Sequence, residues 1–406
     1  MRLEKLRGAV QTCAGTQPKV QMKILLIHNR YQIAGGEETV VHAEQALLSS
    51  RGHEVRLWEA DNRLITGTVG PALHAVYSPA ARRQTAQLLD EFKPDVVHVH
   101  NFFPLLSPAI YYACGAAHVP VVQTLHNYRL ICPNALLFRD GHVCEDCVGR
   151  ALPWPGVWHA CYRDSHAASL AVATMLTTHR LLRTWSKEVG RYIVLSEFAR
   201  EKFVSRGGLP AAKIEVKPNF VHPAPSAGDG SGGFALYVGR LSEEKGLKVL
   251  VPTWQQLGAS LPLKIVGDGP LRPWLKNWAD EQPGVEYVGL LKRDSVIQLM
   301  RQARLLVFPS LWYEGFPMTI IEAFATALPV IASDLGSAAT LIEHRRTGLH
   351  FRPGDSHHLA EQIHWALAHP AEWERMRQEA RKEFETHYTA DRNYELLSAI
   401  YSHVCQ

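Results

Sequence analysis

Two cationic side chains, Arg240 and Lys245, stand five residues apart in a loop that leads from a strand-like run into a helical pattern. Guanidinium and ammonium groups are common partners of phosphate oxygens, so this pair could clamp a diphosphate. Further on, Gly267 and Gly269 frame a second strand-to-helix turn, where the missing side chains permit close approach of the backbone to a ligand. The same turn also explains itself without any ligand.

Two carboxylates, Glu314 and Glu322, are spaced E-x7-E around the motif Gly315-Phe316-Pro317. Proline fits the first turn of a helix, which places Glu314 on the preceding loop, at the positive end of the helix, and Glu322 further along it. Carboxylates in these positions can accept hydrogen bonds from sugar hydroxyls, one from a hexose and one from a ribose. The alternative is helix capping with one exposed glutamate; the flanking aromatic residues favour the functional interpretation.

Polar residues also follow strand-like runs in the first half of the chain. Gly35 and Gly36 form a glycine pair that opens a helix, where backbone N–H groups could point at an anion. His126 follows the run 121–125 directly. A simple tight turn and a structural histidine are the corresponding alternatives.

Several catalytic motifs are absent from the sequence. It contains no Asp-x-Asp, no Walker loop, no Gly-x-Ser-x-Gly elbow and no His-Glu-x-x-His. We therefore expect no catalytic metal. Without a metal, Arg240, Lys245 and helix N-termini would have to stabilise the negative charge on a departing diphosphate.

Strand-like and helical patterns alternate along the chain, which predicts parallel sheets wrapped by helices. Strand-like runs occupy 22–28, 54–58, 96–100 and 119–125 in the first half, and 234–238, 263–266, 285–288, 305–308, 330–332 and 349–351 in the second. Two helical patterns, 371–387 and 391–403, end the chain. Two such doubly wound domains would bind ligands in a cleft at the carboxyl ends of their strands.

Composition supports two domains and sets the boundaries between them. The chain has 406 residues, of which 46% are hydrophobic and 20% charged, and this excludes a disordered or fibrous protein. The segment 223–233 is rich in glycine and proline and has almost nothing to bury, so we expect a linker there. Residues 1–21 lack periodicity and precede a strand that begins with its own methionine, Met22; we expect a disordered leader, and leave open whether it is translated.

Charge and hydropathy bear on location. No run of 18 apolar residues occurs and the first twenty residues lack a secretory apolar block, so we expect a cytoplasmic protein. Residues 1–222 carry 25 Lys and Arg against 18 Asp and Glu, and the rest 18 against 21, giving +7 and −3. The apolar run 167–176, followed by basic residues, could rest on an anionic membrane as a peripheral contact, or could be a packed helix with a solvated basic end.

Four cysteines, Cys132, Cys144, Cys147 and Cys161, fall within thirty residues and include a C-x2-C knuckle. Four thiolates can close a tetrahedral structural zinc site, without catalysis, over a Cys-rich insertion at 132–161. Disulfides, an iron–sulfur cluster and free thiols are the alternatives.

Taken together, these residues resemble the family 4 retaining glycosyltransferases of GT-B fold, which transfer a sugar from a nucleotide-diphosphate donor. The likeness covers nearly the whole chain from Met22 and is strongest at 239–246, at the turn 267–270 and at the glutamate pair. It implies an α/β protein with two doubly wound Rossmann-like domains facing across a cleft: residues 22–222 on the acceptor side and 234–386 on the donor side. The segment 387–406 would be a helix that crosses back to the first domain.

The resemblance also implies roles for individual residues. Arg240 and Lys245 would neutralise the donor diphosphate, Glu314 would hold the transferred sugar, and Glu322 would contact the ribose. His126 would lie near the transferred sugar, and the loop at Gly35 and Gly36 near the diphosphate and acceptor. The cysteine cluster departs from the commoner family pattern.

The leading hypothesis is therefore a cytoplasmic, metal-independent hexosyltransferase of cell-surface polysaccharide synthesis, with a UDP or GDP sugar as donor and a glycan or lipid-linked acceptor. A nucleotide-sugar epimerase of the same architecture is the first alternative, and a zinc-containing interaction module the second. The near-neutral total charge and the lack of aromatic residues among the basic ones argue against nucleic acid as a partner.

Overall fold

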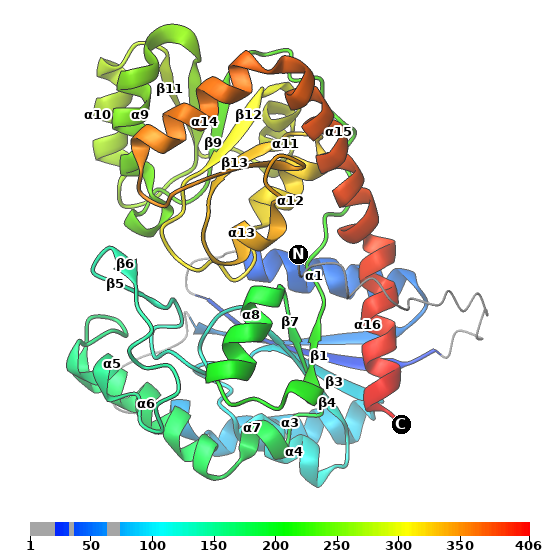
Figure 1. The fold of residues 1–406 in the computed structure, drawn as a ribbon. Helices are drawn as coiled ribbons and strands as arrows, with labels where there is room; N and C mark the ends of the chain where they lie inside the picture. The colour runs from blue at the N-terminus through cyan, green and yellow to red at the C-terminus, as the bar shows by residue number, and fades with distance from the viewer. Residues whose placement is uncertain (1–20, 32–35, 63–73) are drawn as a thin grey trace, which may run out of the picture.

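The computed structural model describes residues 21–31, 36–62 and 74–406, and in this part of the chain two parallel six-stranded sheets are flanked by helices (Figure 1). This confirms the predicted α/β class with two doubly wound domains. The glycine of the predicted pair at position 35 and the leader up to residue 20 lie outside the described residues.

The N-terminal sheet has the strand order β2-β1-β3-β4-β7-β8. Its interior is a continuous apolar run, as expected for parallel strands buried on both faces; Ile24 to Ile27 of the first strand are fully buried. The strands are β1 (Lys23–Arg30), β2 (Glu54–Asp61), β3 (Val96–Asn101), β4 (Val121–Leu125), β7 (Arg191–Val194) and β8 (Ile214–Val216). The sequence analysis did not identify the short strands β7 and β8, of four and three residues.

Helices connect these strands: α1 (Gly36–Ser50), α3 (Pro79–Phe92), α4 (Ala109–Ala116), α5 (Trp154–Trp158), α6 (His166–Leu181), α7 (Thr184–Lys187) and α8 (Glu197–Glu201). Local chemistry fixes several of their starts. The Ser78 side chain accepts a hydrogen bond from the Ala81 N–H at the start of α3, where Pro79 takes the first helical position. Ser165 caps α6 in the same way.

The C-terminal sheet has the order β11-β10-β9-β12-β13-β14, the arrangement of a dinucleotide-binding fold. Its strands are β9 (Ala235–Val238), β10 (Leu263–Val266), β11 (Val285–Gly289), β12 (Leu305–Phe308), β13 (Val330–Ser333) and β14 (Gly348–Phe351). Its helices are α9 (Leu250–Leu257), α10 (Arg272–Glu281), α11 (Arg293–Gln302), α12 (Met318–Ala325), α13 (Gly336–Leu341) and α14 (Ser356–Ala368). Pro317 precedes α12 rather than occupying its first turn, one residue earlier than expected.

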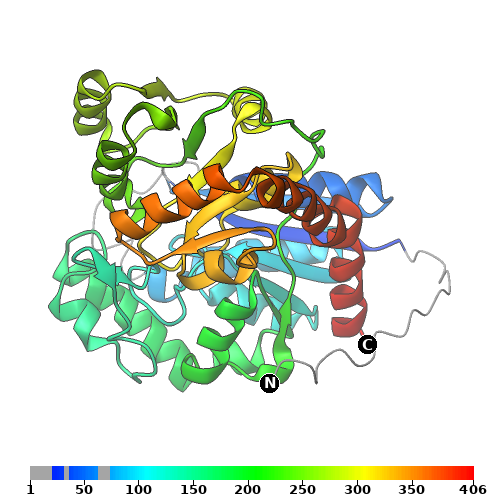
Figure 2. The ribbon, with the colours of Figure 1, turned by 45° about the horizontal axis from the view of Figure 1, so that its top comes forward.

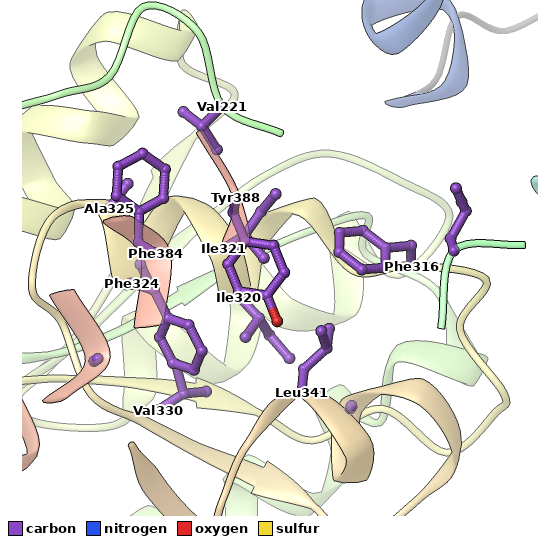
Figure 3. Packing of buried hydrophobic residues seen from close by; sticks show 14 of the residues in the cluster. Val221, Phe316, Ile320, Ile321, Phe324, Ala325, Val330, Leu341, Phe384 and Tyr388 are labelled. Carbon is purple, nitrogen blue, oxygen red and sulfur yellow. The ribbon is translucent and has the colours of Figure 1, made fainter. Parts of the chain in front are cut away.

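The helix α12 packs into an apolar core that it shares with α15 (Pro370–His387). Figure 3 shows Ile320, Ile321 and Phe324 of α12 beside Phe384 and Tyr388, all of which are buried. Full burial of each large apolar side chain contributes about 1.5–3 kcal/mol relative to exposure. This core fixes α12, and with it the loop that carries Glu314.

The last helix, α16 (Ala390–Val404), returns to the N-terminal domain, as Figure 2 shows. The hydroxyl of Tyr401 lies 2.7 Å from Nδ1 of His98 on β3, and the amide of Asn393 donates to the carbonyl of Pro218. This confirms the predicted crossing helix. The segment 223–233 contains no helix or strand, but it is not loose: the N–H groups of Gly228 and Gly232 donate to carbonyls of Thr326 and Gln302.

Candidate active site

The loops after β9 and β12 meet at the point where the strand order of the C-terminal sheet reverses. Strand β9 pairs with β10 on one side and β12 on the other, so the chain leaves their carboxyl ends in opposite directions and opens a crevice. Lys245 comes from the first loop, and Ser310 and Glu314 come from the second. The tertiary fold thus brings together two groups that the sequence predicts separately, a diphosphate cation and a sugar-binding carboxylate.

Glu314 is the centre of this arrangement. Its Oε1 lies 2.7 Å from Nζ of Lys245 and accepts a hydrogen bond of 2.8 Å from the Ser310 hydroxyl, while the glutamate is 6% exposed. The Lys245 ammonium also lies 5.3 Å from the centre of the Trp312 ring. Ser310 is a site residue that the sequence analysis missed; its position directly after a buried strand, like that of the other candidates, is the signal that could have found it.

Glycine holds the two loops together at one position. Gly246 has φ +70°, and a Cβ there would lie 1.8 Å from the carbonyl oxygen of Pro309. The N–H of Leu311 donates to the carbonyl of Glu244 across the same seam. Only glycine permits this approach, and the approach places Lys245 next to Glu314.

The predicted turn glycines are also explained by contacts within the protein. A Cβ on Gly267 would lie 1.9 Å from the carbonyl oxygen of Gly239, and one on Gly269 would lie 2.5 Å from that of Leu241. These glycines therefore allow the loops after β9 and β10 to pack closely. A role for them in donor binding stays a prediction.

Two other predicted residues do not join the Lys245–Glu314 pair. Arg240 is exposed, and its side chain has no ion-pair partner in the described part of the chain. Glu322 lies along α12 and pairs with Arg293, whose Nε is 2.9 Å from Oε1. Arg293, on α11, is a further polar residue of this region that the sequence analysis did not identify.

The N-terminal domain closes directly over the glutamate loop. A Cβ on Gly315 would lie 2.2 Å from the carbonyl oxygen of His126, so glycine is required where the two domains touch. The Tyr128 hydroxyl donates to the Glu314 carbonyl at 3.4 Å, and the hydroxyls of Ser196 and Ser337 are 2.8 Å apart. Phe316, the next residue, is buried in the core that both domains share. The backbones of His126 and Glu314 thus lie next to each other where the two domains touch.

His126 belongs to a buried polar network within the N-terminal domain. Its Nε2 lies 3.0 Å from Nδ1 of His100, and Nε2 of His100 lies 3.5 Å from the carboxylate of Glu44. The other Glu44 oxygen is 2.5 Å from Nζ of Lys217, which is fully buried. Glu44, on α1, and Lys217, after β8, are missed by the sequence analysis. A charged residue on the buried face of α1 was the available signal.

Burial sets the protonation of this network. It lowers the pKa of His126 to about 3 and that of His28 to about 4, so both imidazoles are neutral near pH 7. Burial acts to raise the pKa of Glu44, but the Lys217 ammonium outweighs it and the pKa is lowered. Glu44, His98 and His100 have ligand atoms within 4.8 Å of one another, yet the Lys217 ammonium already supplies a cation to the carboxylate.

The start of α1 lies beside the other domain. A Cβ on Gly36 would be in ordinary contact, at 3.9 Å, with Met318 at the start of α12. Nearby, the Tyr31 hydroxyl donates to Glu37 at 2.9 Å, and burial raises the pKa of this carboxyl to about 8. His28 is fully buried, and neither of its ring nitrogens has a hydrogen-bond partner among the described residues. Nδ1 of His28 lies 3.7 Å from a carboxylate oxygen of Glu37, so these groups form a buried polar cluster at the start of α1.

A cavity of about 30 Å³ lies at the carboxyl ends of β3 and β4, bordered by Tyr31, Phe103, His126, Asn127 and Arg129 among others. Such a volume holds about two water molecules. The Arg129 guanidinium stacks 4.6 Å from the centre of the Phe103 ring. This cavity is lined by aromatic, amide and cationic groups, which can contact polar hydroxyls.

Two facing Rossmann-like domains are the architecture of the GT-B fold, and comparison with known proteins identifies the chain as a glycosyltransferase of this fold. A family model described as "Glycosyltransferase Family 4" matches residues 34–224, and one described as "Glycosyl transferases group 1" matches residues 223–383. The two models adjoin and between them cover both domains. The chain belongs to the family 4 glycosyltransferases.

The individual relatives have low sequence identity to this chain. Glycogen synthase of Mycobacterium tuberculosis is 27% identical over 320 residues, which is 76% of this chain and 69% of the relative. O-antigen chain mannosyltransferase C of Escherichia coli is 29% identical over 173 residues, 42% of this chain and 46% of the relative. The crystal structure of Anabaena HepE in complex with UDP matches with a TM-score of 0.68 at 18% identity, covering 94% of this chain and all of that one. This last likeness supports the fold.

Proposed function

We propose that this protein is a retaining, metal-independent hexosyltransferase that moves a hexose from a UDP- or GDP-type sugar to a glycan or lipid-linked acceptor in cell-surface polysaccharide synthesis. The observation that carries the proposal is the pairing of Lys245 with Glu314 at the reversal point of the C-terminal sheet, under the carbonyl of His126. A cation and a buried carboxylate side by side suit a ligand that joins an anionic diphosphate to a polyhydroxylated sugar.

In the proposed reaction, the bond between the anomeric carbon and a diphosphate oxygen breaks, and the acceptor hydroxyl attacks that carbon from the same face. The hydroxyl proton passes to the departing phosphate oxygen, so no side-chain base is needed. Lys245 and the exposed Arg240 would stabilise the negative charge on the diphosphate. Glu314 would accept hydrogen bonds from the sugar, Glu322 from the ribose, and His126 would stand near the transferred sugar.

Contact between the domains supports transfer over hydrolysis. The close approach of Gly315 to His126 and the hydroxyl pair Ser196 and Ser337 bring the facing walls together. A closed cleft excludes water from the reactive intermediate. The relatives also favour this chemistry, since HepE is recorded with UDP and with UDP-glucose, and two relatives named above are polysaccharide enzymes by name.

The donor is tested by thermal shift with UDP, GDP, ADP and their sugar conjugates, each with Mg²⁺ or with EDTA. Ligand at about a hundred times its dissociation constant stabilises the native state by about 2.7 kcal/mol. We expect a shift with a UDP or GDP series that survives EDTA. A shift that requires Mg²⁺ would contradict metal independence. Conversion of the donor alone to an isomer would indicate the epimerase instead.

A surface of the N-terminal domain suits a lipid-linked acceptor. Helices α5 and α6 lie side by side at the edge of the domain far from α9 and α10 (Figure 1). Large apolar side chains are exposed there, and Trp158 and Leu181 are 72% and 77% exposed. We name this surface the α5–α6 face and define it by Leu152, Trp154, Trp158, Leu170, Leu181 and Leu182.

Charge favours an anionic bilayer as the occupant of the α5–α6 face. Between Arg150 and Lys187 the chain has five Lys and Arg but a single acidic residue, Asp164. Exposed tryptophans with basic neighbours are typical of peripheral contact with an anionic lipid surface. Among the described residues, no helix is long and apolar enough to cross the bilayer. We therefore propose that the enzyme works in the cytoplasm with this face resting on the inner surface of the membrane.

Sedimentation with vesicles tests the membrane contact. Wild type should bind phosphatidylcholine vesicles containing phosphatidylglycerol, and binding should fall about tenfold or more in Trp154→Ser/Trp158→Ser. Leu290→Ser is the matched control, because Leu290 is 74% exposed but lies in the C-terminal domain. Equal binding by wild type and the double variant would overturn the membrane proposal. Nucleotide thermal shifts check that both variants are folded.

A further inference from the structure

Four thiols surround one small cavity in the N-terminal domain. Cys132, Cys144, Cys147 and Cys161 line a space of about 10 Å³, together with Pro133, Asn134, Phe138 and Arg139. A cavity of this volume holds about one water molecule. The lining contains no carboxylate or imidazole, and each of the four cysteines is free of a disulfide. The donor set is thus composed of sulfur.

The cysteines reach this cavity from separate parts of the insertion. Cys132 ends a turn that hydrogen bonds back to Tyr128. Cys144 follows the hairpin of β5 (Phe138–Arg139) and β6 (His142–Val143), and its N–H donates to the carbonyl of Leu137. Cys147 lies in the next turn, and Cys161 follows α5. The four thiols thus line one cavity, but no three of their sulfurs lie within 4.8 Å of one another, so they must move together to share an ion.

The insertion has little regular structure to hold it. The hairpin strands have two residues each, and α5 has five. Six residues other than glycine adopt positive φ between Cys132 and Ser165: Ala135, Leu137, Asp140, Ala160, Arg163 and Asp164. Such conformations persist when the surrounding structure imposes them. A constraint at the centre of the insertion would help to impose these conformations.

We propose that these four cysteines bind one zinc ion, which holds the insertion in shape. Zinc takes four thiolates at about 2.3 Å in a closed tetrahedron and carries no catalysis in such a site. In the structure the Cys132 thiol donates to Asn134 at 2.8 Å, and the Cys147 thiol donates to the Pro153 carbonyl at 3.7 Å. Binding replaces both contacts with Zn–S bonds, draws the sulfurs inward and releases the thiol protons.

The zinc site would act on the acceptor side without touching substrate. Arg129, which borders the cavity near His126, bonds to the carbonyl of Pro133 and lies 4.9 Å from the Tyr162 ring. Pro133 and Tyr162 are the immediate neighbours of Cys132 and Cys161. Leu152, Trp154 and Trp158 of the α5–α6 face belong to the same insertion. The inference does not rest on the proposed donor chemistry, because a closed four-thiolate site takes no part in catalysis.

The test is metal analysis of the full-length protein purified without a histidine tag. We expect about one zinc per chain by mass spectrometry of the elements, falling below a tenth in Cys144→Ser/Cys147→Ser and unchanged in Cys405→Ser, whose cysteine is exposed on the last residues of the chain. Chelation of the wild type should increase proteolysis within 132–161 and leave the UDP or GDP thermal shift in place.

A second measurement covers the case in which the double variant fails to fold. Wild type grown with Co²⁺ should show the charge-transfer and visible bands of a four-thiolate cobalt site. Metal-free protein with four thiols reactive to a disulfide reagent would overturn the proposal, as would bound iron or a disulfide within the cluster. If the wild-type protein contains zinc but binds none of the nucleotides, that result would count against the proposed function alone.

Discussion

The Lys245 ammonium and the Glu314 carboxylate lie 2.7 Å apart although 69 residues separate them in the chain. Each residue belongs to a loop at the carboxyl end of a neighbouring strand, and Gly246 lets the loops touch. In the proposed function the pair would couple donor binding to the folded state of the C-terminal domain, because the same ammonium that would meet a diphosphate also balances a carboxylate that is 6% exposed.

Replacing Lys245 with Met should weaken diphosphate binding and remove the cation that balances the Glu314 carboxylate. We expect nucleoside diphosphate affinity to fall about tenfold or more, equivalent to about 1.4 kcal/mol, because a charge-assisted contact is lost. Isothermal titration calorimetry with UDP and GDP measures the effect. Lys248→Met is the control, since Lys248 is 60% exposed and pairs with Glu243 instead. Equal affinity in wild type and Lys245→Met would remove Lys245 from the diphosphate site.

Replacing Gly315 with Ala should push the two domains apart. The new Cβ would lie 2.2 Å from the carbonyl oxygen of His126, a backbone atom that cannot turn aside. Overpacking of this kind costs about 1–3 kcal/mol, and we expect a lower melting temperature together with a larger radius of gyration in X-ray scattering. Gly36→Ala, whose Cβ would be 3.9 Å from Met318, should leave the melting temperature within a degree or so. An unchanged melting temperature of Gly315→Ala would mean that the domains separate at Gly315 and His126 without loss of stability.

Removing Lys217 should destabilise the N-terminal domain strongly. Lys217→Met leaves the Glu44 carboxylate buried without its ammonium partner, which costs about 3–5 kcal/mol. The double variant Lys217→Met/Glu44→Gln should recover much of the loss, because the uncompensated charge is gone. Urea unfolding of the wild type, both single variants and the double variant measures the coupling between the two residues. Additive losses would show that the two residues do not interact energetically.

Acidification should destabilise the protein through its buried histidines. Burial lowers the pKa of His28 from its ordinary value of 6.5 to about 4 in the folded chain, so the unfolded chain takes up the proton first as pH falls. The stability from neutral His28 is therefore present above pH 6.5 and lost progressively toward pH 4, by about 3 kcal/mol. His126, with a pKa of about 3, acts in the same direction over a wider range.

The measurement is the free energy of unfolding of wild type and His28→Asn between pH 7 and 4. The variant should show a smaller slope, by up to one proton or about 1.4 kcal/mol per pH unit. Glu37, with its pKa raised to about 8, titrates in the opposite sense: its contribution is greatest below pH 4.5 and is lost as pH rises through 8. The difference between the two proteins isolates His28, and parallel slopes would contradict its neutral burial.

The sequence by itself determined most strands of the two sheets and their order. The strands β10 and β12 begin and end where the apolar runs predict, because a strand buried on both faces must be apolar along its length. The glycines after β9 and β10, the position of Glu314 ahead of α12 and the cysteine spacing are also local patterns. They were enough to indicate the class of protein, since a parallel sheet brings the ends of its strands to one edge.

Only the tertiary structure decided which of these residues meet. The pairing of Lys245 with Glu314, the burial of Glu44 against Lys217 across 173 residues, and the contact of Gly315 with the His126 carbonyl depend on how strands, helices and domains pack. The exposure of Trp158 and Leu181 is decided in the same way, because a local pattern does not show which apolar face finds a partner. Sequence periodicity shows which face of a helix or strand is apolar. It does not show which distant residue that face contacts, because the packing of the whole chain decides this.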